Sequence, residues 1–130
     1  MLFKRILKPG GYVCLLWNQR ETTTGLMNDY NDIIKRLYND YPTGSARGHN
    51  TNDVFKNFYN NNFEIKNCFW HETLSFEELW GRSLSSSHAP VPGHPNYEPL
   101  KTALQGLFEK YNDNGAIQFE YRTEVIIGRL

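Results

Sequence analysis

The sequence predicts an α/β fold of three main strands and about four helices, and three patterns lead to it. Residues 12–17 are apolar without interruption, residues 26–41 carry apolar side chains at three- and four-residue steps, and residues 117–127 alternate strictly. The first pattern is typical of a strand covered on both faces, the second of an amphipathic helix, and the third of a strand with one wet face. We expect the order strand–helix–helix–strand–helix–helix–strand.

A short helix is expected before the first strand. Residues 1–7 place apolar side chains at helical spacing, their lysines and arginine suit a helix carboxyl end, and Pro9-Gly10-Gly11 ends the helix. The run Tyr12–Trp17 follows. Because this run would be apolar on both faces, we expect a parallel-type strand. No strand precedes it in these 130 residues, so we interpret the chain as the second half of a larger sheet.

The central part of the chain predicts two helices and a strand. Helix 26–41 ends before Pro42, residues 43–49 form a loop, and a shorter helix covers 54–59. Residues 63–73 first alternate and then become denser in large side chains. We expect them to form a strand near a sheet edge.

The start of the next helix has a local signature. Ser75 and Glu78 have the spacing of a capping box, and Leu74 and Leu79 occupy the two hydrophobic-staple positions. These residues predict a helix over 75–84.

The last third of the chain predicts a loop, a helix and a strand. Residues 85–95 form the loop and residues 97–111 the helix, and Asn114-Gly115 supplies a left-handed stop. In the final strand the dry face is expected to hold Ile117, Phe119, Tyr121, Thr123, Val125 and Ile127. Since the other face is wet, we expect this strand to be antiparallel.

Composition excludes several classes of function. The 130 residues suit one domain or a piece of one, and 14 basic residues balance 14 acidic ones. A duplex nucleic-acid binder or a polybasic membrane clamp needs a basic excess, so we expect neither partner. The longest apolar run has six residues, whereas a membrane-spanning helix needs about 18.

The two cysteines, Cys14 and Cys68, lie in strand-like segments. We expect both to be buried, reduced thiols and the compartment to be the cytoplasm. The basic amino end agrees, because a proline and two glycines stand where a signal peptide would carry its apolar region.

Several segments together resemble a known family. The segment Ile6–Val13, with its Leu-Lys-Pro-Gly-Gly, resembles the helix, turn and strand that lead into the fifth strand of class I S-adenosylmethionine-dependent methyltransferases. Four further segments are similar to the small-molecule branch called methyltransferase type 11: Leu15–Asn18, Gly81–Pro90, Gly93–Tyr97 and the end of the chain from Phe119 to Leu130. The resemblance implies the carboxyl-terminal half of a Rossmann-like methyltransferase sheet. Residues 1–130 would then be a single partial domain, with the last strand inserted beside the fifth.

The family's cofactor motifs are missing from this sequence. The family uses a Gly-rich turn after the first strand and an acidic residue at the end of the second. No G-x-G-x-x-G or G-x-G-x-G occurs here, and Gly10-Gly11 precedes a strand instead of following one. We therefore expect S-adenosylmethionine to serve the complete family enzyme but not this chain alone. We predict that the chain alone is inactive, and we assign no cofactor-binding or catalytic residue.

Two groups of residues are candidates for substrate binding. Trp17, Asn18 and Arg20 lie where the first strand ends, the usual ligand edge of open α/β sheets. Arg82 can offer a planar fork to an anionic or polar group, and the loop after it can add hydroxyl donors. That loop contains Ser85, Ser86, Ser87 and His88. The structural alternatives are a core tryptophan with a turn asparagine, and an ordinary solvated loop.

The histidines do not suggest a metal site. His88 and His94 are six residues apart, with no carboxylate or thiol at ligand spacing, so no metal is expected. We expect His71 to be a satisfied or half-exposed strand residue. No G-x-S-x-G elbow for a serine nucleophile occurs.

A second hypothesis of another class stays open. The chain could be a non-enzymatic, self-associating α/β module, because the strand Tyr12–Trp17 leaves an edge that must be paired or covered. We expect a homodimer or a complementing chain to pair through this strand. A separately encoded cofactor-binding half is a third possibility.

Overall fold

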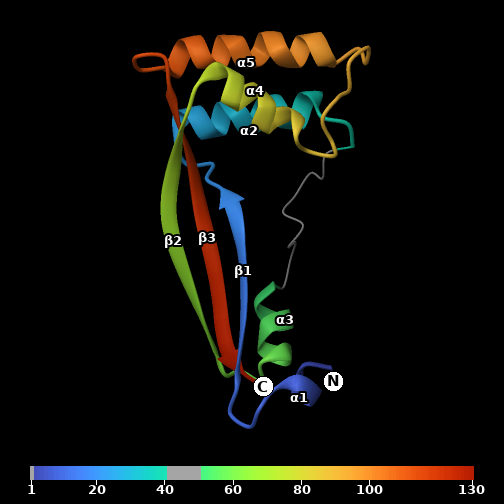
Figure 1. The fold of residues 1–130 in the computed structure, drawn as a ribbon, viewed down its shortest axis with the longest axis vertical. Coiled ribbons are helices and arrows are strands. Elements are labelled where there is room, and N and C mark those ends of the chain that lie inside the picture. The colour runs from blue at the N-terminus through green and yellow to red at the C-terminus, as the bar shows by residue number, and fades with distance from the viewer. Residues whose placement is uncertain (1, 41–50) are drawn as a thin grey trace. The chain divides into compact units, whose positions relative to one another are not determined.

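A computed structural model describes residues 2–40 and 51–130, and the chain has the expected α/β composition (Figure 1). Three strands form one sheet in the order β1-β3-β2. The elements are α1 (Leu2–Ile6), β1 (Tyr12–Arg20), α2 (Gly25–Leu37), α3 (Thr51–Phe58), β2 (Phe63–Leu74), α4 (Phe76–Leu84), α5 (Tyr97–Tyr111) and β3 (Ile117–Arg129).

All neighbouring strands run antiparallel, as the arrows in Figure 1 show. Along β1 and β3, Tyr12 bonds to Arg129 and Asn18 to Thr123, so residue numbers rise on one strand as they fall on the other. Trp70 of β2 likewise bonds to Thr123. The expected parallel-type strand is therefore wrong: the apolar run of β1 was compatible with either direction, and β1 pairs with β3 alone among the described residues.

The expectation that β1 is covered on both faces is also wrong. Val13 is buried, but Tyr12 is 57% and Leu16 63% exposed, so burial alternates along the strand. The two cysteines were expected to be buried, yet Cys14 and Cys68 are free and exposed. Cys14 follows the buried Val13 and so points to the other face of β1, whereas residues 64–71 of β2 are exposed at odd and even positions alike, which leaves Cys68 exposed.

The chain divides into two compact units, which we describe separately. The first takes in the described residues of Met1–Gln19, Gly44–Trp70 and Arg122–Leu130. Its core is the cluster of Val13, Phe55, Tyr59 and Ile126. Tyr59 of the turn after α3 is fully buried, and its hydroxyl lies 3.2 Å from the carbonyl of Val13 and 3.4 Å from that of Ile126.

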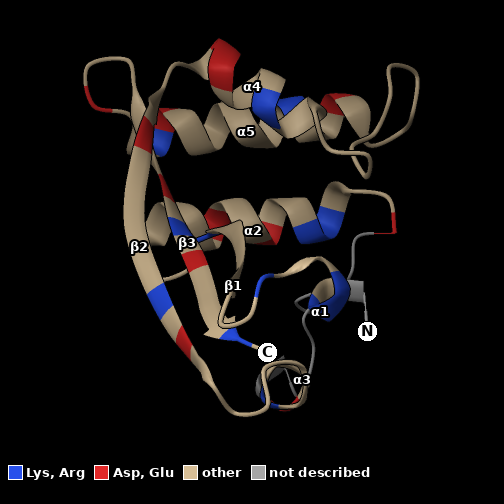
Figure 2. Cartoon of the chain, turned by 60° about the horizontal axis from the view of Figure 1, so that its bottom comes forward, with Lys and Arg blue, Asp and Glu red and all other residues tan. Residues whose placement is uncertain are grey.

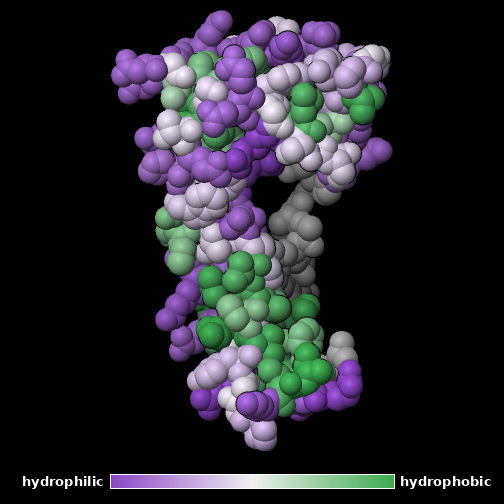
Figure 3. All heavy atoms as spheres, in the orientation of Figure 1, coloured by the Kyte–Doolittle hydropathy of each residue, from purple (hydrophilic) through white to green (hydrophobic). Residues whose placement is uncertain are grey.

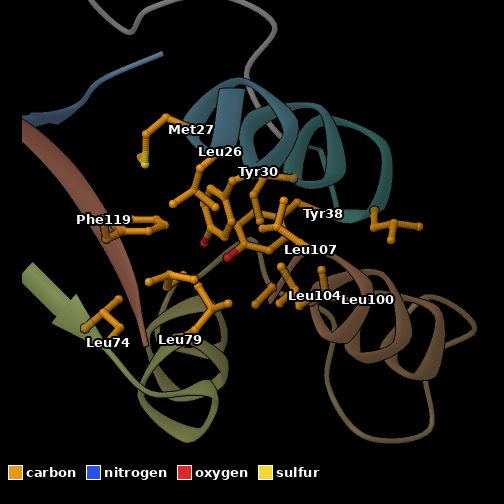
Figure 4. Packing of buried hydrophobic residues seen from close by; sticks show 14 of the residues in the cluster. Leu26, Met27, Tyr30, Tyr38, Leu74, Leu79, Leu100, Leu104, Leu107 and Phe119 are labelled. Carbon is orange, nitrogen blue, oxygen red and sulfur yellow. The ribbon is translucent and has the colours of Figure 1, made fainter. Parts of the chain in front are cut away.

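The second unit comprises Arg20–Thr43 and His71–Tyr121, and it holds the larger core (Figure 4). Helices α2, α4 and α5 contribute Tyr30, Leu79 and Leu104 to this core, and Phe119 enters it from β3. Ser83 is completely buried and accepts or donates a hydrogen bond with the hydroxyl of Tyr30 at 2.9 Å, while the Tyr38 hydroxyl donates to the Ser83 carbonyl. These bonds satisfy polar groups that would otherwise be costly to bury.

Helix boundaries follow local side-chain chemistry. The predicted capping box is confirmed: Ser75 accepts from the backbone N–H of Glu78, whose carboxylate accepts from the Ser75 N–H. Leu74 and Leu79, the predicted staple pair, are both buried. Helix α2 ends at Leu37, earlier than predicted, because Tyr38 turns to extended backbone. The predicted end at residue 41 and the loop 43–49 lie outside the described residues.

Burial changes phase along β3. Ile117, Phe119 and Tyr121 are buried as predicted, but farther along the strand Ile126 and Gly128 are buried in place of Val125 and Ile127. The buried positions of β3 are odd-numbered up to Tyr121, in the second unit, and even-numbered from Ile126, in the first, a change of phase that strict alternation could not reveal. A tight turn with positive φ at residues 114 and 115 leads into β3, and β2 lies at a sheet edge, as predicted.

Gly128 allows the closest backbone approach in the first unit. A Cβ atom at this position would lie 2.3 Å from the Asn62 carbonyl oxygen and 2.8 Å from Tyr59 Cδ1. We predict that Gly128→Ala lowers the free energy of unfolding by about 1–3 kcal/mol, the usual cost of overpacking. Urea unfolding measures the change.

Gly106 of α5 provides a matched control. A Cβ atom there would meet nothing within 4 Å. Because alanine is a better helix former, Gly106→Ala is expected to leave stability unchanged or raise it by roughly 0.5–1 kcal/mol. Equal effects of the two substitutions would contradict the close packing of β3.

Candidate functional site

Arg82 is the centre of a polar cluster in the second unit. It lies on α4, and its guanidinium binds the carboxylate of Glu72 on β2 and the hydroxyl of Tyr121 on β3. The guanidinium carbon also lies 5.4 Å from the centre of the Tyr121 ring. The planar fork of arginine is suited to such two-sided contact. These partners hold Arg82 in one orientation.

The charge of Arg82 is therefore already neutralised. The Glu72 carboxylate pairs with it, and both side chains are about one-third exposed. Burial raises the pKa of the Tyr121 hydroxyl, against the opposing effect of the Arg82 charge, so the phenol stays protonated at neutral pH. The cluster consequently contributes no excess positive charge, which disfavours the anionic half of the predicted substrate preference.

An open cavity of about 540 Å³ lies beside this cluster. Its lining residues are Leu74, Glu78, Gly81, Arg82 and Ser85. The carboxylate of Glu78 adds one negative charge, and Leu74 supplies an apolar wall. Together with the paired Arg82, this lining suits a neutral polar group better than a carboxylate or a phosphate.

The predicted serine loop enters this cavity only in part. Ser85 lines the cavity, but its hydroxyl donates to the Arg82 carbonyl at 2.6 Å. Ser86 accepts from the backbone N–H of His88, and Asn39 after α2 donates to the His88 carbonyl. Ser87 is exposed. These hydrogen bonds thus stabilise the loop itself and attach it to Asn39, just after α2.

The residues at the end of β1 have other partners. Trp17 stacks on Phe55 with ring centres 5.9 Å apart, as the structural alternative anticipated. Asn18 accepts a hydrogen bond of 2.6 Å from Thr123, which in turn accepts one of 2.8 Å from Trp70. A chain of hydrogen bonds therefore crosses the three strands of the first unit.

Arg20, the third predicted residue of this group, belongs to the second unit. Its guanidinium lies 5.3 Å from the centre of the Tyr30 ring, a cation–π distance. The structure thus brings Arg82 and Ser85 to one cavity, whereas Trp17 and Asn18 belong to the first unit.

The sequence did not identify the partners of two candidate residues: Glu72 and Tyr121 for Arg82, and Thr123, with Trp70 beyond it, for Asn18. Their link to Arg82 and Asn18 depends on the sheet register, which no local motif reveals. The alternation of 63–73 and 117–127 was the available signal, since it assigns each residue to a face, but it does not align one strand with another.

The Gly10-Gly11 turn does not form a cofactor cradle. A Cβ atom on Gly11 would meet the Lys8 carbonyl oxygen at 2.9 Å and Leu7 at 3.3 Å, so the turn encloses its own backbone. Gly10 has φ +75° and serves the chain reversal. This turn therefore does not fit the donor that the family resemblance implies.

Within residues 2–40 and 51–130, no three His, Cys, Asp or Glu side chains are grouped as metal ligands would be. His71, expected to be satisfied or half-exposed, is exposed on β2. No described helix has the length and apolar character needed to cross a bilayer.

A second open cavity, of about 290 Å³, lies between α2 and α5. Its wall includes Asp29, which accepts hydrogen bonds from Tyr111 at 2.6 Å and from Lys110 at 3.1 Å. These two bonds hold the pKa of Asp29 below its ordinary value. The carboxylate is thus committed to joining the two helices.

No protein-family model matches the chain, and no curated protein is significantly similar to it.

Arg82→Lys tests the central cluster. A lysine cannot reach Glu72 and Tyr121 together through a planar fork, so we expect a loss of roughly 1 kcal/mol, the scale of a half-exposed ion pair. Thermal unfolding measures it. Arg36→Lys, an exposed arginine of α2, is the control. Equal melting temperatures for the two variants would show that Arg82 is not held by its partners.

The lowered pKa of Asp29 predicts that the stability of the chain depends on pH. Because its pKa is lowered by folding, the stabilisation is fully present above the ordinary carboxyl value of about 4 and is lost as the pH falls through the lower, folded value. Asp29→Asn is expected to lower the melting temperature at neutral pH. The melting temperature of the variant should also decrease less steeply than that of the parent as the pH is lowered into the acid range. Identical melting temperatures of variant and parent at pH 7 would contradict the assignment.

Proposed function

We propose that this chain is the acceptor-side half of an S-adenosylmethionine-dependent methyltransferase fold of the small-molecule type, and that it transfers no methyl group by itself. The observation that carries the proposal is the strand order β1-β3-β2, in which the last strand of the chain lies between the other two and antiparallel to both.

This strand order supports the proposal because it is uncommon for consecutive strands. Sequential strands usually lie side by side, but here β1 and β2 are separated by a strand that comes 43 residues after the end of β2. The resemblance of Ile6–Val13 and of the chain's end implies this insertion of the last strand beside the fifth. In this proposal the three strands belong to a larger, Rossmann-like sheet.

In the proposed enzyme, this half would supply walls for the methyl acceptor. The cavity beside Arg82 would hold a neutral polar part of the acceptor, with Leu74 as the apolar wall and Glu78 as a hydrogen-bond acceptor. Methyl transfer is a direct displacement that depends mainly on holding the acceptor in line. Rigidly held side chains such as Arg82 would serve that positioning.

Titration calorimetry with S-adenosylmethionine tests the lack of activity. Because the 130 residues contain no Gly-rich turn after a strand, we expect no binding tighter than the millimolar range. Binding in the micromolar range would overturn this part of the proposal.

Complementation tests the assignment to the fold. The chain is co-expressed with a tagged cofactor-binding half of a class I methyltransferase, and the captured material is assayed for retention of the chain and for S-adenosylmethionine binding. The tagged half alone is the control. We expect capture of the chain and tighter donor binding by the complex. Failure of the two halves to associate would contradict the proposed function.

A further inference from the structure

We propose that two copies of this chain associate by antiparallel pairing of their β1 strands, with Cys14 on the two-fold axis. The proposal stands on the edge chemistry of β1 and does not depend on the proposed function. Among the described residues β1 has one strand neighbour, β3, so no described strand pairs with its other edge, which we call the open edge.

The hydrogen-bond phase of β1 defines which groups face the open edge. The N–H of Glu21 donates to the Glu120 carbonyl of the opposite segment at 2.9 Å. In an antiparallel pair, alternate residues bond to the same neighbour, so the odd-numbered residues of β1 face β3. Tyr12, Cys14, Leu16 and Asn18 therefore direct their backbone N–H and C=O groups to the open edge.

The part of this edge from Tyr12 to Leu16, which would pair, carries none of the features that prevent pairing. Residues 12–19 contain no charge, no proline and no glycine, and Arg20 at the end of β1 is its one charged residue, whereas the other edge strand, β2, carries Glu64 and Lys66. Figure 2 shows acidic and basic bands next to each other on β2. Charged side chains are a common protection of sheet edges. An uncharged edge meets no like charge in a second copy, and this electrostatic compatibility favours self-pairing at β1 over β2.

Apolar exposure selects the register. Leu16 is 63% and Tyr12 57% exposed, and Figure 3 shows apolar residues gathered around β1 and α3. A two-fold axis at Cys14 sets Tyr12 opposite the partner's Leu16 and brings only apolar residues together. An axis at Leu16 would instead set Tyr12 opposite the charged Arg20 of the other copy and Cys14 opposite its Asn18. The first register removes more apolar surface from water.

The register also gives a covalent reporter. Residues that share a hydrogen-bonded pair have Cα atoms about 5.5 Å apart, within the range of about 4.4–6.8 Å that a disulfide spans. Oxidation would join the two Cys14 thiols and pass two electrons and two protons to the added oxidant. Cys68, on the far edge strand, would not meet its counterpart.

The test measures mass and cross-linking of the full chain. Sedimentation velocity over a micromolar concentration series is expected to show a reversible dimer, since pairing of one strand lies at the small end of protein interfaces. Leu16→Lys is expected to weaken the dimer by roughly tenfold or more. Val54→Lys on α3 is the matched control, because Val54 is 62% exposed and lies off the edge.

The second arm uses copper-phenanthroline oxidation. The Cys68→Ser variant, which keeps Cys14, is expected to form a disulfide-linked dimer, and the Cys14→Ser variant is not. A monomer throughout the concentration series would overturn the proposal, as would equal weakening by the two lysine variants. Cross-linking through Cys68 in place of Cys14 would place the interface elsewhere and would also overturn it.

Discussion

Pairing of β3 with two strands at once is the constraint on which the structure depends. Each edge of β3 bonds to a strand from a distant part of the sequence, and residues of β3 enter the cores of both units, Phe119 in one and Ile126 in the other. Because β3 follows all the other described elements in the sequence, neither core can be completed until residues 117–129 have joined β1 and β2. The α/β arrangement is therefore dominated by contacts between residues far apart in sequence, which form late and at high entropic cost.

The two units satisfy their buried polar groups differently. In the second unit, Tyr30 and Tyr38 bond to Ser83, which pairs these buried polar groups where α2 and the residue after it meet α4. In the first, Tyr59 bonds directly to strand carbonyls. The candidate cavity belongs to the more heavily packed second unit, where Arg82 is held by the sheet on one side. Its neutralised charge is the reason we assign a polar, uncharged acceptor.

Helix starts and turns that depend on neighbouring residues could be predicted from the sequence. The capping box at Ser75 and the turn at Asn114-Gly115 were predicted from neighbouring residues, and both are present. The direction and burial of β1 were not predictable, because an apolar run reports only that its side chains avoid water and not which neighbours cover them. Likewise the partners of Arg82 and Asn18 depend on register, and Trp17 was assigned to a ligand edge although Phe55 covers it.

The hydroxyl of Tyr59 has a consequence for the accuracy of strand pairing. The hydroxyl proton of Tyr59 is shared between the carbonyls of Val13 on β1 and Ile126 on β3. It can reach both only in the present register of the two strands. A slip of β1 by a single residue would turn the Val13 carbonyl away and remove the nearer of the two acceptors of this buried hydroxyl. The Tyr59 side chain thus stabilises the present register of β1 and β3 relative to a shifted one.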